Sequence, residues 1–212
     1  MDHTTFPADS SLLVMVRHGQ SLYNLENRFT GNLDVELTDL GRQEAQRAGE
    51  QLKRFHFDVA YTSMLKRAQE SLTIILKAIG ETEIPVYKDA ALNERGYGDL
   101  QGLNKGDILK QYGEEQFNLW RRSYAIPPPN GESLKDTETR AIPYFTKEIE
   151  AHLMAGKNVL IVAHGNSLRT IIKNLEHISD EDIPQRELST GVPEIYSFNR
   201  ETKTYTHQKA TV

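Results

Sequence analysis

The amino-acid sequence predicts an α/β fold, a three-layer sandwich in which a mostly parallel central sheet carries helices on both faces. Two short segments, residues 12–16 and 159–163, are continuously apolar, which is typical of strands buried on both faces of a parallel sheet. Each segment is followed closely by a His-Gly pair, at His18 and at His164. Amphipathic helical patterns separate the predicted strands, and this alternation favours a parallel sheet.

The next elements follow from apolar spacing and from a turn residue. A third, weaker strand is predicted at residues 58–61, and helices are predicted over residues 38–55 and 63–79. Gly80 is expected to end the second helix, because glycine readily adopts the left-handed conformation found after a helix.

Two further helical patterns lie in the second half of the chain. Apolar residues recur at helical spacing over residues 133–155, where Pro143 is expected to bend the helix and Gly156 to end it. Another apolar helix face consists of Leu168, Ile171, Ile172 and Leu175. Ligands of such folds bind beyond the carboxyl ends of the strands, so both His-Gly pairs are expected to open onto one crevice.

The 212 residues are expected to form a single domain, residues 1–212. The longest interruption between apolar segments is the Pro-rich stretch at residues 126–131, which is too short and too stiff to link independent units. Residues 1–10 and 202–212 are expected to be flexible tails, because chain ends are commonly frayed.

Composition favours a soluble protein with a small ligand. The net charge of −5 and the pI near 5.8 argue against nucleic acid or an anionic membrane as the main partner, because both attract basic surfaces. No apolar run is long enough to cross a bilayer and no secretion signal is recognisable, so a cytoplasmic location is expected. The absence of cysteine excludes disulfides and thiolate metal sites.

The histidines and several arginines indicate a site for an anion. A single His-Gly pair is more often a loop histidine satisfied by backbone, but two pairs in one sheet bring two imidazoles to the same edge. Guanidinium groups match the oxygens of phosphate and carboxylate. The candidates are Arg17, Arg67, Arg121 and Arg122. Glu94 and Lys105 are equally compatible with ordinary surface roles, so the residues alone indicate an anion-binding α/β enzyme with two histidines.

The ordered motifs of the chain resemble those of a known family. They are Val16-Arg17-His18-Gly19-Gln20-Ser21 with Asn24, Phe29-Thr30-Gly31, Tyr61-Thr62-Ser63 with Arg67, Leu92-Asn93-Glu94-Arg95, Tyr97-Gly98-Asp99-Leu100-Gln101-Gly102, Trp120-Arg121-Arg122-Ser123-Tyr124, Glu132-Ser133-Leu134-Lys135-Asp136 and Ala163-His164-Gly165-Asn166-Ser167-Leu168-Arg169. From about residue 12 to residue 198 the chain resembles the cofactor-dependent phosphoglycerate mutases of the histidine phosphatase superfamily. The Arg-His-Gly motif indicates only the superfamily, whereas the Asn-Glu-Arg and Arg-Arg-Ser-Tyr segments point to the mutase branch.

The resemblance implies a reaction and a role for each motif residue. The family interconverts 2-phosphoglycerate and 3-phosphoglycerate in glycolysis and gluconeogenesis, which implies that His18 is the nucleophile and Glu94 the general acid and base. The resemblance places around the transferred phosphoryl group Arg17, Asn24, Arg67 and His164. Other substrate contacts that it implies are Ser21, Thr30, Gly31, Tyr97, Lys105, Arg121, Arg122, Gly165 and Asn166.

The resemblance also implies a cofactor and partners. The bisphosphate 2,3-bisphosphoglycerate would prime the enzyme by phosphorylating His18, and no metal ion is expected. The expected partners are small-molecule phosphoglycerates, with no nucleic acid and no membrane, and the expected assembly is a monomer or a small homo-oligomer. Two departures concern Gly96, where many relatives have histidine, and residues 127–132, which lack an insertion found in many relatives. Subunit contacts are therefore not carried over.

Three other functions agree less well with the sequence than the mutase does. A broad-specificity histidine phosphatase would give the phosphoryl group to water, and Lys105 with the Arg121-Arg122 pair weighs against it, because hydrolysis needs no second clamp. A bisphosphoglycerate mutase is disfavoured by Ser21, where that branch tends to have a smaller residue. A non-catalytic phosphate-binding module is disfavoured because both histidines and the glutamate are present.

Overall fold

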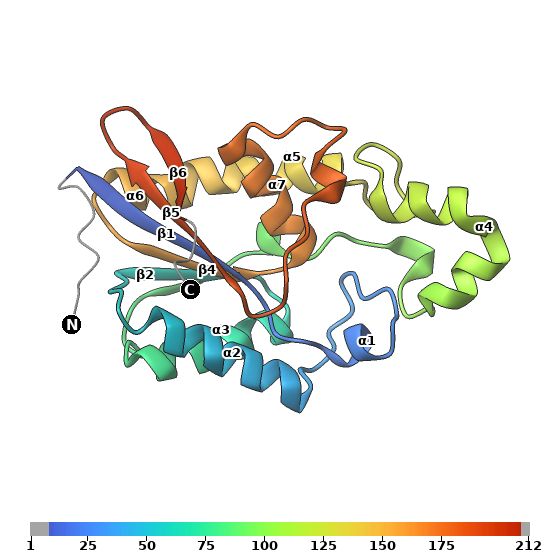
Figure 1. Ribbon diagram of the computed structural model, residues 1–212, viewed down its shortest axis with the longest axis horizontal. Coiled ribbons are helices and arrows are strands. Elements are labelled where there is room, and N and C mark those ends of the chain that lie inside the picture. The colour runs from blue at the N-terminus through green and yellow to red at the C-terminus, as the bar shows by residue number, and fades with distance from the viewer. Residues whose placement is uncertain (1–8, 209–212) are drawn as a thin grey trace.

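The computed structural model describes residues 9–208, and its centre is a six-stranded sheet (Figure 1). The strands are β1 (Ser10–Arg17), β2 (Val59–Thr62), β3 (Val86–Lys88), β4 (Val159–Ala163), β5 (Pro193–Asn199) and β6 (Thr204–Gln208). Their order across the sheet is β3-β2-β4-β1-β5-β6. Strands β3, β2, β4 and β1 are parallel, whereas β5 is antiparallel to both of its neighbours. The prediction of a mostly parallel sheet is therefore confirmed.

Helices cover both faces of the sheet, which confirms the three-layer arrangement (Figure 1). One face carries α2 (Asp39–Leu52) and α3 (Lys66–Ile79), and the other carries α5 (Leu134–Tyr144), a π-helical turn (Phe145–Ile149), α6 (Glu150–Met154) and α7 (Gly165–Glu176). Side chains of β1 alternate between the two layers, so that Val14 packs in the core with α2 and α3 and Met15 in the core with α6 and α7. None of the helices within residues 9–208 is long and apolar enough to cross a membrane.

The predicted helix ends are found at glycines. Gly80 follows α3 with a φ of 81°, and Gly156 follows α6 with a φ of 82°. Pro143 lies near the end of α5, and the hydrogen-bond pattern becomes π-helical directly after it, over Phe145–Ile149. The interruption expected from the proline is thus a change of helix type in a continuous helical segment.

The long helix α4 (Lys105–Arg122) was not predicted. It consists of two helical segments that join at Gly113, where φ is 79°, a conformation that favours glycine. Its apolar residues Ile108 and Phe117 pack with Phe29 and Leu100 in a small core of their own. Figure 1 shows α4 beyond the sheet, at the same end of the molecule as α1 (Leu22–Leu25).

The prediction of flexible tails is corrected for the residues that the structure describes. Residues 204–208 form β6, which pairs with β5, and Ser10 pairs with Asn199 at the start of β1. Tyr205 anchors β6, since its ring lies 4.6 Å from that of Phe198 and its hydroxyl donates to Glu150 Oε2 over 2.8 Å. Strand pairing uses backbone groups, so the polar sequence of β6 gave no apolar signal. The remaining parts of the predicted tails, 1–8 and 209–212, lie outside the described residues.

Candidate active site

The two histidines are delivered by neighbouring parallel strands. The register of β1 and β4 pairs Arg17 with Ala163, so the next residue of each strand, His18 and His164, lies at the same edge of the sheet. The two imidazole rings are 4.9 Å apart between centroids and meet edge to face. Both side chains are buried. The expectation that the two His-Gly pairs share one site is confirmed.

His18 is held as a neutral ring whose Nε2 lone pair meets only a long hydrogen bond from Arg67. Its Nδ1 lies 2.7 Å from the carbonyl oxygen of Gly19 and donates to it, while Nε2 accepts from Arg67 Nε over 3.3 Å. Burial, and then the charges of Arg67 and Arg17, lower the pKa of His18 well below its usual value. At neutral pH Nε2 is therefore unprotonated and chemically suited to attack phosphorus.

His164 presents a buried ring nitrogen without a hydrogen-bond partner among residues 9–208. Its Nε2 lies 2.7 Å from Ser63 Oγ, which also accepts a hydrogen bond from the Leu65 backbone N–H. Within the described part of the chain, His164 Nδ1 and Arg17 Nε are both buried without a hydrogen-bond partner. Two unpaired buried polar nitrogens near His18 need an explanation, and a bound anion that accepts from the Arg17 Nε–H would supply one.

Two glycines allow the loop of His18 to pack against a helix. A Cβ atom on Gly19 would lie 2.0 Å from the carbonyl oxygen of Gly41, at the start of α2. A Cβ atom on Gly41 would lie 2.1 Å from the carbonyl oxygen of Gln20. Ser71 of α3 also accepts from the Gly19 backbone N–H over 3.1 Å. The backbone that carries the nucleophile is thus fixed by both helices of one layer.

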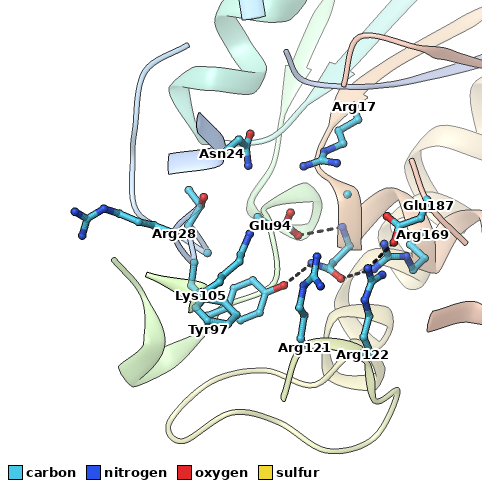
Figure 2. A pocket seen from close by; sticks show the side chains of 15 residues that line it. Arg17, Asn24, Arg28, Glu94, Tyr97, Lys105, Arg121, Arg122, Arg169 and Glu187 are labelled. Atoms are coloured by element: carbon cyan, nitrogen blue, oxygen red, sulfur yellow. Dashed lines mark hydrogen bonds and ion pairs between the residues drawn. The ribbon is translucent and has the colours of Figure 1, made fainter. Parts of the chain in front are cut away.

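A cavity opens next to the two His-Gly pairs, where Arg17 and Gly165 form part of its wall (Figure 2). Its wall is formed by Arg17, Asn24, Arg28, Phe29, Thr30, Gly31, Glu94, Tyr97, Lys105, Arg121, Arg122, Gly165, Asn166, Arg169 and Glu187. Figure 2 shows Arg17 and Asn24 on one side of the cavity and Lys105, Arg121 and Arg122 on the opposite side. The cavity therefore offers cations at both ends to one ligand.

The cations at the second end are crowded and partly removed from water. Burial lowers the pKa of Lys105 and the pKa of Arg121, and Arg122 lowers that of Arg121 further. Burial acts to raise the pKa of Tyr97, but Arg95, whose guanidinium lies 4.5 Å from the ring centre, lowers it overall. A bound anion would relieve the repulsion among these cations.

Glu94 lies in the segment after β3, and its carboxylate reaches the start of α7. Its Oε1 accepts hydrogen bonds from the backbone N–H groups of Arg95, over 2.8 Å, and Asn166, over 3.1 Å. The residue is 8% exposed, so its carboxylate faces the cavity from a largely buried position. Glu94, the predicted acid and base, is therefore part of the cavity wall.

An ion pair clamps the backbone on both sides of Glu94. Arg140 of α5 donates to the carbonyl oxygens of Glu94, over 3.0 Å, and Ala91, over 2.8 Å. Its guanidinium also forms two 3.0 Å hydrogen bonds with the carboxylate of Glu132. Glu132 in turn accepts from the Gly96 backbone N–H over 2.7 Å. The Arg140–Glu132 pair therefore fixes the position of the Glu94 loop.

Most of the predicted site residues meet at this cavity. The predicted residues that line it are Arg17, Asn24, Thr30, Gly31, Glu94, Tyr97, Lys105, Arg121, Arg122, Gly165 and Asn166. His18, Arg67 and His164 are buried and do not line it; His18 and His164 are chain neighbours of the lining residues Arg17 and Gly165. Ser21 does not line the cavity: it is buried as the N-cap of α1, where its backbone N–H and its hydroxyl both donate to Asn24 Oδ1 over 3.0 Å. Ser21 orients Asn24.

Sequence reasoning missed four residues of the cavity wall: Arg28, Phe29, Arg169 and Glu187. Arg169 carried a usable signal, because it lies one helical turn after Asn166 and donates to Asn166 Oδ1 over 2.8 Å. Glu187 carried no such signal, because it lies in a loop outside all the motifs that contain predicted residues.

Within residues 9–208, no group of three or more histidine, aspartate or glutamate side chains is arranged to hold a metal ion. The charged groups that face the cavity are cationic side chains and two carboxylates, and the buried imidazoles of His18 and His164 adjoin its lining residues Arg17 and Gly165 in the chain. This α/β fold and site define an enzyme class in which a phosphoryl group is carried on histidine.

The chain belongs to the histidine phosphatase superfamily (branch 1), whose family model matches residues 13–211. It is 56% identical over 190 residues to the 2,3-bisphosphoglycerate-dependent phosphoglycerate mutase of Nitrobacter hamburgensis, covering 89% of this chain and 92% of that protein. It is also 56% identical over 188 residues to the enzyme of the same name from Cytophaga hutchinsonii, covering 89% and 88% of the two chains. The resemblance seen in the motifs is therefore confirmed.

Solved structures share the fold at lower sequence identity. The mycobacterial glucosyl-3-phosphoglycerate phosphatase superimposes with a TM-score of 0.80 at 26% identity, over 94% of this chain and 97% of that one. Bacillus stearothermophilus YhfR superimposes with a TM-score of 0.82 at 28% identity, over 94% and 96% of the two chains.

Proposed function

We propose that this protein is a 2,3-bisphosphoglycerate-dependent phosphoglycerate mutase, which interconverts 2-phosphoglycerate and 3-phosphoglycerate. The observation that carries the proposal is a single cavity with cations at both ends. One end has Arg17, which precedes the buried His18 in the chain, and the other has Lys105, Arg121 and Arg122. A phosphoglycerate carries a phosphate and a carboxylate, so a ligand of this kind satisfies both ends. The identity of above 50% with mutases over about nine-tenths of the chain supports the same reaction.

In the proposed reaction, His18 Nε2 attacks the phosphorus of 2,3-bisphosphoglycerate in line, and the N–P bond forms as the bond to the leaving oxygen breaks. Arg17, Asn24, Arg67 and His164 surround the transferred group and stabilise the charge on its equatorial oxygens. Glu94 gives a proton to the leaving hydroxyl and takes one from the hydroxyl that attacks in the reverse direction. The phosphohistidine then gives its phosphoryl group to the free 2-hydroxyl of 3-phosphoglycerate. The bisphosphate formed in this way turns in the site and returns its 3-phosphoryl group to His18, which releases 2-phosphoglycerate.

The second end of the cavity would orient the acid during this exchange. Lys105, Arg121 and Arg122 offer cations to the carboxylate and to the phosphate that does not react. Tyr97, Asn166, Gly165, Thr30 and Gly31 also line the cavity. In this proposal the arginines and histidines neutralise the transferred group, so turnover needs no metal ion and needs the bisphosphate only as a primer.

A histidine phosphatase is the second candidate, because the mycobacterial structure with the same fold is named as a phosphatase. The two functions differ in the acceptor of the phosphoryl group, which is a second hydroxyl of the glycerate in the mutase and water in the phosphatase. The cationic group at the far end favours the mutase, because hydrolysis does not require the acid to be re-oriented. A bisphosphoglycerate mutase would differ in accumulating the bisphosphate as product.

One assay separates these functions. Enzyme treated with a strong chelator and then freed of it is supplied with 3-phosphoglycerate, with and without 2,3-bisphosphoglycerate, and the products are resolved as 2-phosphoglycerate, bisphosphate and inorganic phosphate. The mutase predicts fast formation of 2-phosphoglycerate only with the primer. Release of inorganic phosphate as the main product would refute it, and activity that returns only on adding a divalent ion would refute the metal-free mechanism.

A further inference from the structure

The cavity contains one carboxylate that the proposed reaction does not use. The wall carries six cationic side chains: Arg17, Arg28, Lys105, Arg121, Arg122 and Arg169. Only two carboxylates, Glu94 and Glu187, face them among the residues that line it. Glu94 is assigned to proton transfer. Glu187 lies in the loop between the short helix Ile183–Gln185 and β5, and needs another explanation.

Glu187 is paired with a cation proposed to bind substrate. Its Oε1 lies 2.6 Å from Arg122 Nη2, and Figure 2 shows it beside Arg122 and Arg169. The Glu187 side chain is 63% exposed and that of Arg122 is 29% exposed. Burial acts to raise the pKa of Glu187, but the contact with Arg122 and the nearby arginines lower it overall, so the carboxylate is ionised at neutral pH. The contact therefore joins a substrate-facing cation to a carboxylate with open access to solvent.

The loop that carries Glu187 already orients the arginines through uncharged groups. Arg122 Nη1 donates to the carbonyl oxygen of Pro184 over 3.2 Å, and Arg169 Nε donates to that of Arg186 over 2.9 Å. Arg17 Nη1 donates to the carbonyl oxygen of Leu188 over 2.8 Å. Three guanidinium groups from three elements are thus held by backbone carbonyls of one short segment. Because these carbonyl groups already orient the three guanidinium groups, the Glu187 carboxylate is not needed to orient Arg122. What it adds is a negative charge.

We propose that Glu187 is a displaceable counter-ion of Arg122, which weakens the binding of the ligand's distal anionic group and eases its release. This inference rests on the proposed function, in that the ligand carries two anionic groups. When the distal group reaches Arg122, the 2.6 Å contact breaks and the carboxylate turns into solvent. When the group leaves, the contact re-forms, so that release leaves no unpaired guanidinium. Glu187 acts on affinity at this end and leaves the chemistry at His18 unchanged.

The test is to remove the charge while keeping the shape, with Glu187→Gln. Unphosphorylated enzyme cannot turn over 3-phosphoglycerate, so its affinity is measured directly by titration calorimetry. The Gln variant is expected to bind 3-phosphoglycerate roughly tenfold more tightly than the wild type, the order that removing one nearby like charge gives at a partly exposed site. Glu187→Asp, which keeps the charge, is expected to stay much closer to the wild type.

Two controls make the result specific. Glu181→Gln changes the net charge equally at an exposed position outside the cavity wall, and is expected to leave the affinity unaltered. Orthovanadate, a single anion that occupies the phosphoryl position at His18, is expected to bind the wild type and the Glu187→Gln variant alike. Unchanged or weaker binding of 3-phosphoglycerate to Glu187→Gln, or equal tightening in Glu181→Gln, would overturn the proposal.

The same variants are titrated with pyrophosphate, which also carries two anionic groups and is not a glycerate. Tighter binding of pyrophosphate by Glu187→Gln supports the counter-ion role independently of the natural substrate. A wild-type enzyme that fails to convert 3-phosphoglycerate in the primed assay would refute the proposed function, while the pyrophosphate comparison still decides the role of Glu187.

Discussion

Replacing Arg140 with methionine should slow catalysis although Arg140 does not line the substrate cavity. The change removes the hydrogen bonds to the carbonyl oxygens of Ala91 and Glu94, a weaker one of 3.2 Å to that of Ala90, and the paired contact with Glu132. At about 1 kcal/mol for each carbonyl contact and about 1 kcal/mol for a partly exposed ion pair, the loss of folding free energy is about 4 kcal/mol. A typical domain has a free energy of unfolding of about 5–15 kcal/mol, so the variant is expected to remain folded.

The catalytic effect follows from the position of Glu94. Without the clamp, the Glu94 carbonyl and the Gly96 N–H lose their common anchor, so the carboxylate is less well placed for proton transfer. A misplacement of about 1 Å can cost about 100-fold in rate, so we expect kcat to fall between roughly tenfold and 100-fold. Arg140→Lys keeps the charge but cannot make the paired contact, and should fall between the wild type and Arg140→Met.

The assay measures kcat for 3-phosphoglycerate at a temperature well below the unfolding midpoint, together with orthovanadate affinity and the urea midpoint. The positioning role predicts a reduced kcat with vanadate affinity near that of the wild type, because the His18 end of the site is intact. Arg47→Met, at an exposed position on α2, is the matched control and should change none of the three. A normal kcat in Arg140→Met, or a parallel loss of kcat and vanadate affinity, would refute the reasoning.

Three further predictions concern the histidines and Glu94. His18→Ala should form no phosphoenzyme, because His18 Nε2 is the lone pair assigned to phosphorus, and acid-labile label from radioactive 2,3-bisphosphoglycerate appearing equally on the variant would contradict this. Glu94→Gln should retain affinity for 3-phosphoglycerate but lose about 10²- to 10⁴-fold in kcat, and a normal kcat would exclude Glu94 as the acid and base. The folded protein lowers the pKa of both His18 and His164 below the ordinary value of 6.5, so the unfolded chain binds more protons below that pH. The stability from these neutral rings is fully present above about pH 6.5 and decreases as the pH falls below it, with about 1.4 kcal/mol for each unit of pKa difference. Urea unfolding between pH 7.5 and 5 measures this, and a free energy of unfolding that rises on acidification over this range would show that the sign is wrong.

Elements with a strong local pattern were predictable from the sequence. The continuous apolar runs located β1 and β4 to within two residues, and Gly80 located the end of α3. The elements that were missed lack such a pattern. Gly113 interrupts the periodicity of α4, and β6 is a polar strand whose place depends on backbone pairing with β5.

The site divides in the same way. The proximity of His18 and His164 could be predicted, because each follows a parallel strand and the sheet brings these strand ends together. Glu187 was missed because its importance arises from a contact with Arg122 at the end of an unpredicted helix, and no spacing in the sequence encodes that contact. Ser21 stays a predicted substrate contact; in the structure its side chain caps α1 and hydrogen-bonds Asn24, which lines the cavity.

The order of the strands sets when the active site can form during synthesis. The strand β1, which carries Arg17 and leads to His18, has as its neighbours β4 and β5, both from the last quarter of the chain. At about 5–20 residues per second, translation needs roughly 10–40 s after β1 before β5 is complete. Until β4 has been made, the apolar residues 12–16 have no sheet partner, and their pairing is completed only when β5 follows. The nascent chain therefore carries an unpaired apolar segment until late in synthesis, and His18 is among the last groups to reach its place in the fold.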